Sequence, residues 1–152
     1  ELLKDTPAPE QRTSADENAA MLIGQAAYAY LQQDHIAHIQ DHLQFGLNPF
    51  FGQSPLADPM YLNNLIEHLK QHQTLWYLNR CNGYVQQATG KPVDDYSDPN
   101  LTQVIDKVYT TVGAHVMLDT QQVFGQFMPS IQQLIQMAEQ RKQQPQLIHL
   151  IH

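Results

Sequence analysis

Two Asp-Pro pairs, Asp58-Pro59 and Asp98-Pro99, each begin a long segment in which apolar residues recur every three or four positions. Aspartate is a preferred helix N-cap, and proline is tolerated at the first helical position because an N–H there would have no partner. Spacings of three and four place apolar side chains on one face of a helix, and no segment shows the period of two that strands require. The chain is therefore predicted to be all-α, with four to five amphipathic helices.

The length of 152 residues is enough for one domain with a core of its own. Residues 1–13 contain two prolines among polar residues and are predicted to be a linker. Residues 14–143 are predicted to form the helical domain, and residues 144–152 a C-terminal tail. Both ends look cut, so we expect a segment of a longer polypeptide that belongs to an oligomeric assembly.

Helix boundaries are predicted from caps and breakers. Ser14 is expected to cap the first helix, with Glu17 completing a capping box three residues later. The alanine-rich run 19–31 is expected to continue as a buried helix. A loop rich in proline and glycine, over 46–59, follows the second helix. Pro145 is expected to end the last helix, because proline lacks the N–H that a helix interior needs.

Charge and composition exclude several functions. The net charge is −7, and lysine and arginine together number only eight, so the chain has no basic patch to grip nucleic acid. No apolar run approaches the roughly 20 residues of a membrane span, and no signal peptide is visible. Cys81 is the only cysteine, which excludes an internal disulfide; we expect it simply to be packed. The stretch Cys81-Asn82-Gly83 is a candidate interruption of the third helix.

Five of the eight histidines form two short clusters, which are the candidate site: His35, His38 and His42, then His68 and His72. At 100° per residue, the first three lie within about 60° of one another on a helix. They flank an apolar stripe, and the second pair is mixed into another stripe. The imidazoles therefore border buried faces.

Two interpretations of these histidines remain open. The first is a zinc or iron site between two helices, because imidazoles at positions i and i+4 chelate well. Against it, Leu69 stands where a zincin helix has its general-base glutamate, no Glu-x-x-His motif occurs, and no inward-facing carboxylate is apparent. The second is polar packing between helices or subunits. We favour packing, so no catalytic residue, cofactor or metal is predicted.

The pattern Asp34-His35-x-x-His38-Ile39-x-x-His42, a Pro-containing loop, and Ile66-x-His68-x-x-x-His72-x-x-x-Trp76 resembles a known family. It is similar to the C-terminal, crown or barrel part of the large portal proteins of short-tailed (podovirus-type) bacteriophages. The likeness covers roughly residues 30–95. The family often has an extended Pro/Asp segment before the first histidine, where this chain has an Ala/Tyr run.

The resemblance implies a structural virion protein and not an enzyme. Such a protein forms a ring, normally of twelve copies, at a capsid vertex, after assembly in the host cytoplasm. Its partners would be other virion proteins and passing, non-specific double-stranded DNA during genome packaging and ejection. An internal virion or DNA-ejection protein is one alternative. A His-rich helical metal-binding module, using the same five histidines with zinc or iron, is the other.

Overall fold

The computed structural model describes residues 12–50, 52–90 and 99–151. These residues form five α-helices, one short 3-10 turn (Pro55–Ala57) and a single isolated bridge between Phe50 and Gln53. The predicted all-α class is therefore confirmed. The helices are α1 (Ser14–Leu22), α2 (His35–Leu47), α3 (Pro59–Thr89), α4 (Pro99–Phe124) and α5 (Met128–Ile151).

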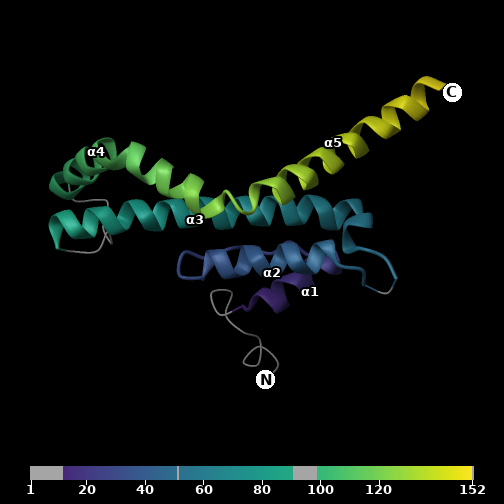
Figure 1. Ribbon diagram of the computed structural model, residues 1–152, viewed down its shortest axis with the longest axis horizontal. Helices are drawn as coiled ribbons and strands as arrows, with labels where there is room; N and C mark the ends of the chain where they lie inside the picture. The colour runs from purple at the N-terminus through teal and green to yellow at the C-terminus, as the bar shows by residue number, and fades with distance from the viewer. Residues whose placement is uncertain (1–11, 51, 91–98, 152) are drawn as a thin grey trace.

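Helix α3 is the central element, and every other helix packs against it. Figure 1 shows α1 and α2 on one side of α3, and α4 and α5 on the other. Helix α4 returns along one half of α3, and α5 lies over the other half before its C-terminal end leaves the body of the molecule. None of the described helices is long and apolar enough to cross a membrane.

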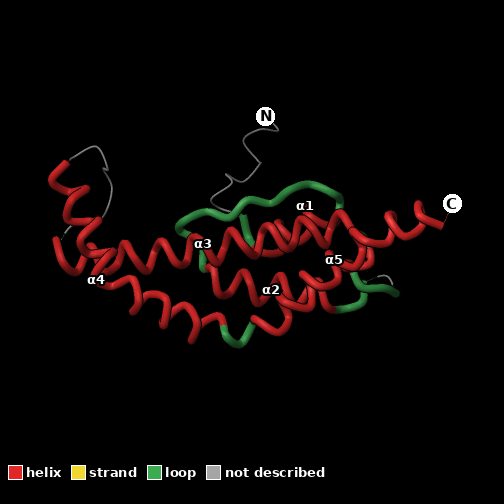
Figure 2. Tube along the Cα trace, turned by 90° about the horizontal axis from the view of Figure 1, so that it is seen from above, coloured by secondary structure: helices red, strands yellow, loops and turns green. Residues whose placement is uncertain are grey.

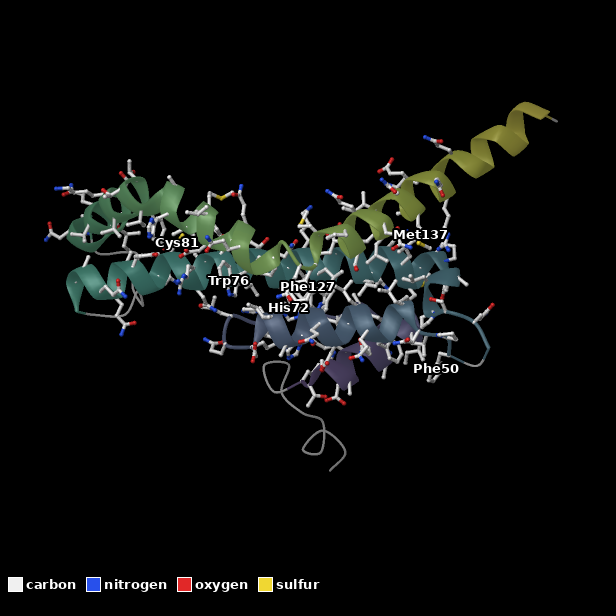
Figure 3. All side chains as sticks on the ribbon, viewed as in Figure 1. Phe50, His72, Trp76, Cys81, Phe127 and Met137 are labelled. Carbon is white, nitrogen blue, oxygen red and sulfur yellow. The ribbon has the colours of Figure 1, made fainter. Side chains whose placement is uncertain are left out.

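The main core lies between the first half of α3, α2, α1 and the α4–α5 junction. Its fully buried side chains include Met21, Ile39, Tyr61, Leu62, Leu65, Leu69 and Leu134. Trp76 meets Phe124 edge to face, with ring centroids 5.1 Å apart. Trp76 and Phe127 mark this junction in Figure 3. The apolar stripes predicted from helical spacing therefore form the core.

The first helix is capped one residue earlier than the sequence predicts. The Thr13 side chain accepts from the Asp16 backbone N–H, and the Asp16 side chain accepts from the Thr13 N–H, so these two form the capping box. The prediction of Ser14 and Glu17 was wrong. Because Asp16 fills the capping position, the Glu17 side chain is free to turn into the protein, where it is completely buried.

The expected helix over 19–31 is also wrong beyond Leu22. Gly24 has a φ of +85°, in the left-handed region that favours glycine, and it ends α1. Residues 25–33, which we call the strap, then run without helix to α2 and appear in Figure 2 as the long green loop beside the helices. Tertiary contacts described below replace the hydrogen bonds that a helix would have supplied.

Some of the other predicted helix boundaries are confirmed, and others are wrong. Asp58 caps α3 with Pro59 at its first turn, and the loop between α2 and α3 is where the Pro/Gly-rich segment was expected. Helix α3 runs unbroken through Cys81, which is buried, and ends at Gly90 with a left-handed φ of 74°. Helix α5 continues to Ile151, past Pro145, so the predicted stop there is wrong. Asp98 and residues 1–11 lie outside the described residues.

Candidate metal centre

Five side chains from three helices meet between α1, α2 and α3. Helix α1 supplies Glu17, α2 supplies His38 and His42, and α3 supplies His68 and His72. All except His38 are at most 1% exposed. The label on His72 in Figure 3 marks the place, where α2 faces α3. The two histidine clusters are therefore brought together within one chain, as contacts between helices.

The Glu17 carboxylate lies at the centre of this group. Its Oε1 is 2.5 Å from Nδ1 of His38, 3.4 Å from Nε2 of His42 and 4.0 Å from Nε2 of His72. Its Oε2 is 3.1 Å from Nε2 of His68. Burial alone would raise the pKa of Glu17, but the contacts with His38, His42 and His68 outweigh burial and hold that pKa far below its ordinary value. Glu17 is therefore ionised.

Hydrogen bonds to the outer ring nitrogens fix the proton positions of His68 and His42. Nδ1 of His68 lies 3.1 Å from the carbonyl oxygen of Ala27 in the strap, so this nitrogen donates. Nδ1 of His42 lies 2.7 Å from Oδ1 of Asn18 and donates to it. Nε2 of both rings therefore faces the centre, and in the neutral form, where the one proton is on Nδ1, each Nε2 presents a lone pair there.

His72 is fixed in the same way through a second histidine. Nε2 of His35 donates to the carbonyl oxygen of Leu31 at 3.1 Å, which leaves its Nδ1 as an acceptor. Nδ1 of His72 donates to that atom at 2.9 Å, so Nε2 of His72 also presents a lone pair to the centre. His35 thus contacts the site from outside, through His72, whereas the alternative metal-binding interpretation of the sequence had included it among the ligands.

Three Nε2 atoms and a carboxylate therefore face one another, and with all three rings neutral they are four acceptors. Nε2 of His72 lies 3.0 Å from Nε2 of His68, and neutral rings have no proton to place between them. Nε2 of His42 is fully buried and has no hydrogen-bond partner among the residues that the structure describes; Oε1 of Glu17 lies 3.4 Å away. Two donors on a tetrahedral zinc ion, each about 2.0–2.1 Å from the metal, lie about 3.3 Å apart, which resembles the spacings measured here.

Burial keeps two of these rings neutral, as metal ligation requires. Desolvation lowers the pKa of His72 from its ordinary value of 6.5 to about 2. Desolvation also lowers the pKa of His42, against the opposing effect of Glu17. The donor atoms of Glu17, His38, His42 and His72 lie within 4.8 Å of one another, close enough to face a single ion.

No family model, no curated protein and no solved structure matches this chain. The chemistry of the centre therefore rests on its own geometry. The resemblance to phage portal proteins stays a prediction.

The sequence analysis found all five histidines but missed the carboxylate. Its statement that no carboxylate faces inward was wrong, because Glu17 had been assigned to the helix cap. A signal was present: Glu17 stands three and four residues before Ala20 and Met21, so it lies on the same buried face of α1. Asn18, the partner of His42, carries a similar signal, because it stands three residues before the buried Met21.

Proposed function

We propose that this protein binds one divalent transition-metal ion, zinc or iron(II), between α1, α2 and α3. The observation that carries the proposal is the convergence of acceptor atoms: Nε2 of His42, His68 and His72 and the carboxylate of Glu17 face one another. Acceptors at these distances repel unless a cation lies among them. A metal ion supplies that cation and accepts all four lone pairs.

The buried charge supports the same conclusion. An ionised carboxylate removed from water is costly unless a positive charge or several hydrogen bonds compensate it. Glu17 is fully buried, and its neighbours His42 and His72 are kept neutral by burial. A dication would leave the centre with one net positive charge, spread over the ligands.

The surroundings of the ligands match those of metal sites. Metal-bound histidines almost always donate their other ring N–H to a carbonyl, carboxylate or water, which fixes the ring and its tautomer. Here Ala27, Asn18 and His35 perform that role for His68, His42 and His72. Three imidazoles and one carboxylate suit zinc or iron(II), which take nitrogen and oxygen ligands readily.

The competing explanation is that a proton, and no metal, holds the centre together. One imidazolium shared between His68 and His72 would neutralise Glu17 and separate the facing lone pairs. The histidines would then be polar packing, as the sequence interpretation favoured. Metal content separates the two explanations directly.

The test strips the protein with a chelator and titrates it with zinc, with calorimetry and elemental analysis as readouts. We expect one tightly held zinc per chain. Glu17→Gln keeps the size of the side chain but removes the ligand charge, and it should weaken zinc binding by at least about 10–100-fold. The matched control is Glu67→Gln, an exposed glutamate on α3, which should bind as the wild type does.

Absence of stoichiometric zinc or iron(II) binding by correctly folded wild-type protein would reject the proposal. Equal affinity of the Glu17→Gln and wild-type proteins would place the ion elsewhere. His115→Ala is a second control, since His115 is an exposed histidine on α4. It should retain the full metal content.

Membership of a portal ring concerns the assembly around this helical unit and remains a separate prediction. It is compatible with the proposed centre, because all the ligands belong to one chain. Light scattering on the purified protein measures whether it assembles into rings.

A further inference from the structure

One side of the metal centre, beside His38, differs from the others in its exposure to solvent. His38 is the only member of the five whose side chain reaches solvent, with 12% of its surface exposed, whereas Glu17, His42, His68 and His72 are sealed. A path from solvent to the centre must therefore pass this ring.

His38 is also held differently. The inner rings are each fixed by a second hydrogen bond to Asn18, Ala27 or His35. His38 makes one side-chain hydrogen bond within the described part of the chain, from Nδ1 to Oε1 of Glu17 at 2.5 Å. Its Nε2 has no such support, so rotation of the ring breaks a single hydrogen bond, besides its ring contacts with His42 and His72.

The remaining four groups suffice to hold an ion. Glu17 and the Nε2 atoms of His42, His68 and His72 make four donors, a complete tetrahedral set, without His38. Four protein ligands alone are the pattern of a closed structural zinc site, but zinc sometimes expands to five-coordination, which leaves room for one exogenous ligand. A ring nitrogen of His38 lies within 4.8 Å of the donor atoms of Glu17, His42 and His72, so this ring reaches the same ion as they do.

We infer that His38 covers a solvent-facing coordination position of the metal, and that a small nitrogen or oxygen donor such as water, azide or imidazole binds there when the ring swings aside. This inference rests on the proposed metal binding. The incoming ligand would lie beside Oε1 of Glu17, where Nδ1 of His38 is now, so a ligand that carries a proton, such as water, can donate a hydrogen bond to that carboxylate oxygen. Access of an exogenous ligand to the metal would then depend on both Glu17 and His38.

The test uses protein loaded with cobalt(II), whose visible absorption reports coordination number and ligand type. His38→Ala should keep one cobalt(II) per chain. Imidazole and azide, added separately, should change its spectrum at concentrations at least about tenfold lower than the wild type requires, as expected when a covering group is removed. His42→Ala, which removes an inner ligand, is the contrast and should lose most of its cobalt(II).

Three results would overturn the inference. His38→Ala could lose cobalt(II) as completely as His42→Ala, which would make His38 an essential ligand. It could keep the metal while neither imidazole nor azide alters the spectrum, which would leave no open position. It could also respond to imidazole and azide at the same concentrations as the wild type, which would place the open position away from His38.

If circular dichroism shows that His38→Ala does not fold, His38→Gln replaces it, with the same outcomes. A folded wild-type protein that binds neither cobalt(II) nor zinc contradicts the proposed function itself, which is a different result.

Discussion

At the residue scale, the centre depends on charges and protons placed where water cannot reach them. Glu17 stays ionised although it is fully buried, whereas His42 and His72 stay neutral because they are buried. In the unfolded chain these groups are exposed to water and have their ordinary pKa values, so folding changes the pKa of each group. This difference links stability to pH.

The metal-free protein should lose stability as the pH falls. Above pH 6.5, the ordinary histidine value, His42 and His72 are neutral whether the chain is folded or not. Below it, the unfolded chain takes up protons that the folded centre excludes. The free energy of unfolding should then fall by up to about 1.4 kcal/mol per pH unit for each ring that stays neutral. Below pH 4.5, Glu17 adds a further loss, since its folded pKa is also lowered.

Urea unfolding of the chelator-treated protein between pH 8 and pH 5 measures this dependence. His115→Ala should follow the same curve, because its ring is exposed on α4. A free energy of unfolding that increases from pH 7 to pH 5 would mean that the folded centre binds a proton. That result would favour the shared-proton explanation over the proposed neutral ligands.

At the element scale, tertiary contacts override local helix preference. The Ala-rich segment after α1 has good helix formers, yet it forms the strap, because side chains of α3 bind its backbone. Gln71 Oε1 accepts from the Ala29 N–H at 2.9 Å, and Asn79 Nδ2 donates to the Leu31 carbonyl at 2.7 Å. These partners are 42 and 48 residues away along the chain, so no local pattern indicates them.

Two glycine substitutions should have opposite effects. Gly24→Ala should lower the free energy of unfolding by about 1–2 kcal/mol, because alanine disfavours the left-handed backbone. A Cβ there would also lie 3.1 Å from Sδ of Met60. Gly83→Ala, in the middle of α3 with open space around it, should raise the free energy of unfolding by about 0.5–1 kcal/mol. Chemical denaturation measures both, and a gain for Gly24→Ala would contradict the described end of α1.

Metal loading should order the strap. The Ala27 carbonyl accepts from His68, so fixing the His68 ring by coordination also fixes the strap backbone. Amide exchange across residues 27–31 should slow when zinc is added. Gln71→Ala should speed exchange at the Ala29 amide, while Gln86→Ala, an exposed glutamine on the same helix, should not. If zinc binds without changing amide exchange in the strap, then metal binding and ordering of the strap are independent.

The candidate break at Cys81-Asn82-Gly83 has a physical origin even though α3 is continuous. Leu65 and Cys81 are both buried, yet 16 positions at 100° place them about 160° apart around the helix. The first half of α3 buries one face against α2 and α5, and the second half buries the opposite side against α4. Because the buried face changes within α3, a single apolar stripe followed along the sequence stops there, although the helix itself continues.

At the scale of the whole molecule, the helical class and the central position of long helices follow from periodicity and Asp-Pro caps. Residues such as Ile39, Leu65 and Leu69 were found because their spacing alone places them in a core. The centre was only half predicted: histidines cluster within single helices, whereas Glu17 joins them through packing of α1 on α2. Periodicity shows which face of a helix is buried, but it does not show which other helix that face packs against.

Zinc should stabilise the whole fold, because the unfolded chain cannot gather ligands from three helices. Saturation at about 100 times the dissociation constant contributes about 2.7 kcal/mol. For a protein of this size that corresponds to a rise in Tm of about 5–10 °C. Calorimetry with and without zinc measures the shift, and Glu17→Gln should show a smaller one. An unchanged Tm in protein that binds zinc would indicate a site formed equally well by the unfolded chain.

The separation of the ligands along the chain also sets when the centre can form. Glu17 and His38 are 21 residues apart, and His35 and His72 are 37 apart, so the donors meet only through long-range contacts. Such contacts are completed late, because closing long loops costs entropy before packing compensates it. An ion bound at this centre would therefore slow unfolding more than it speeds folding. The lifetime of the folded, metal-loaded chain would then depend on how fast the ion is released.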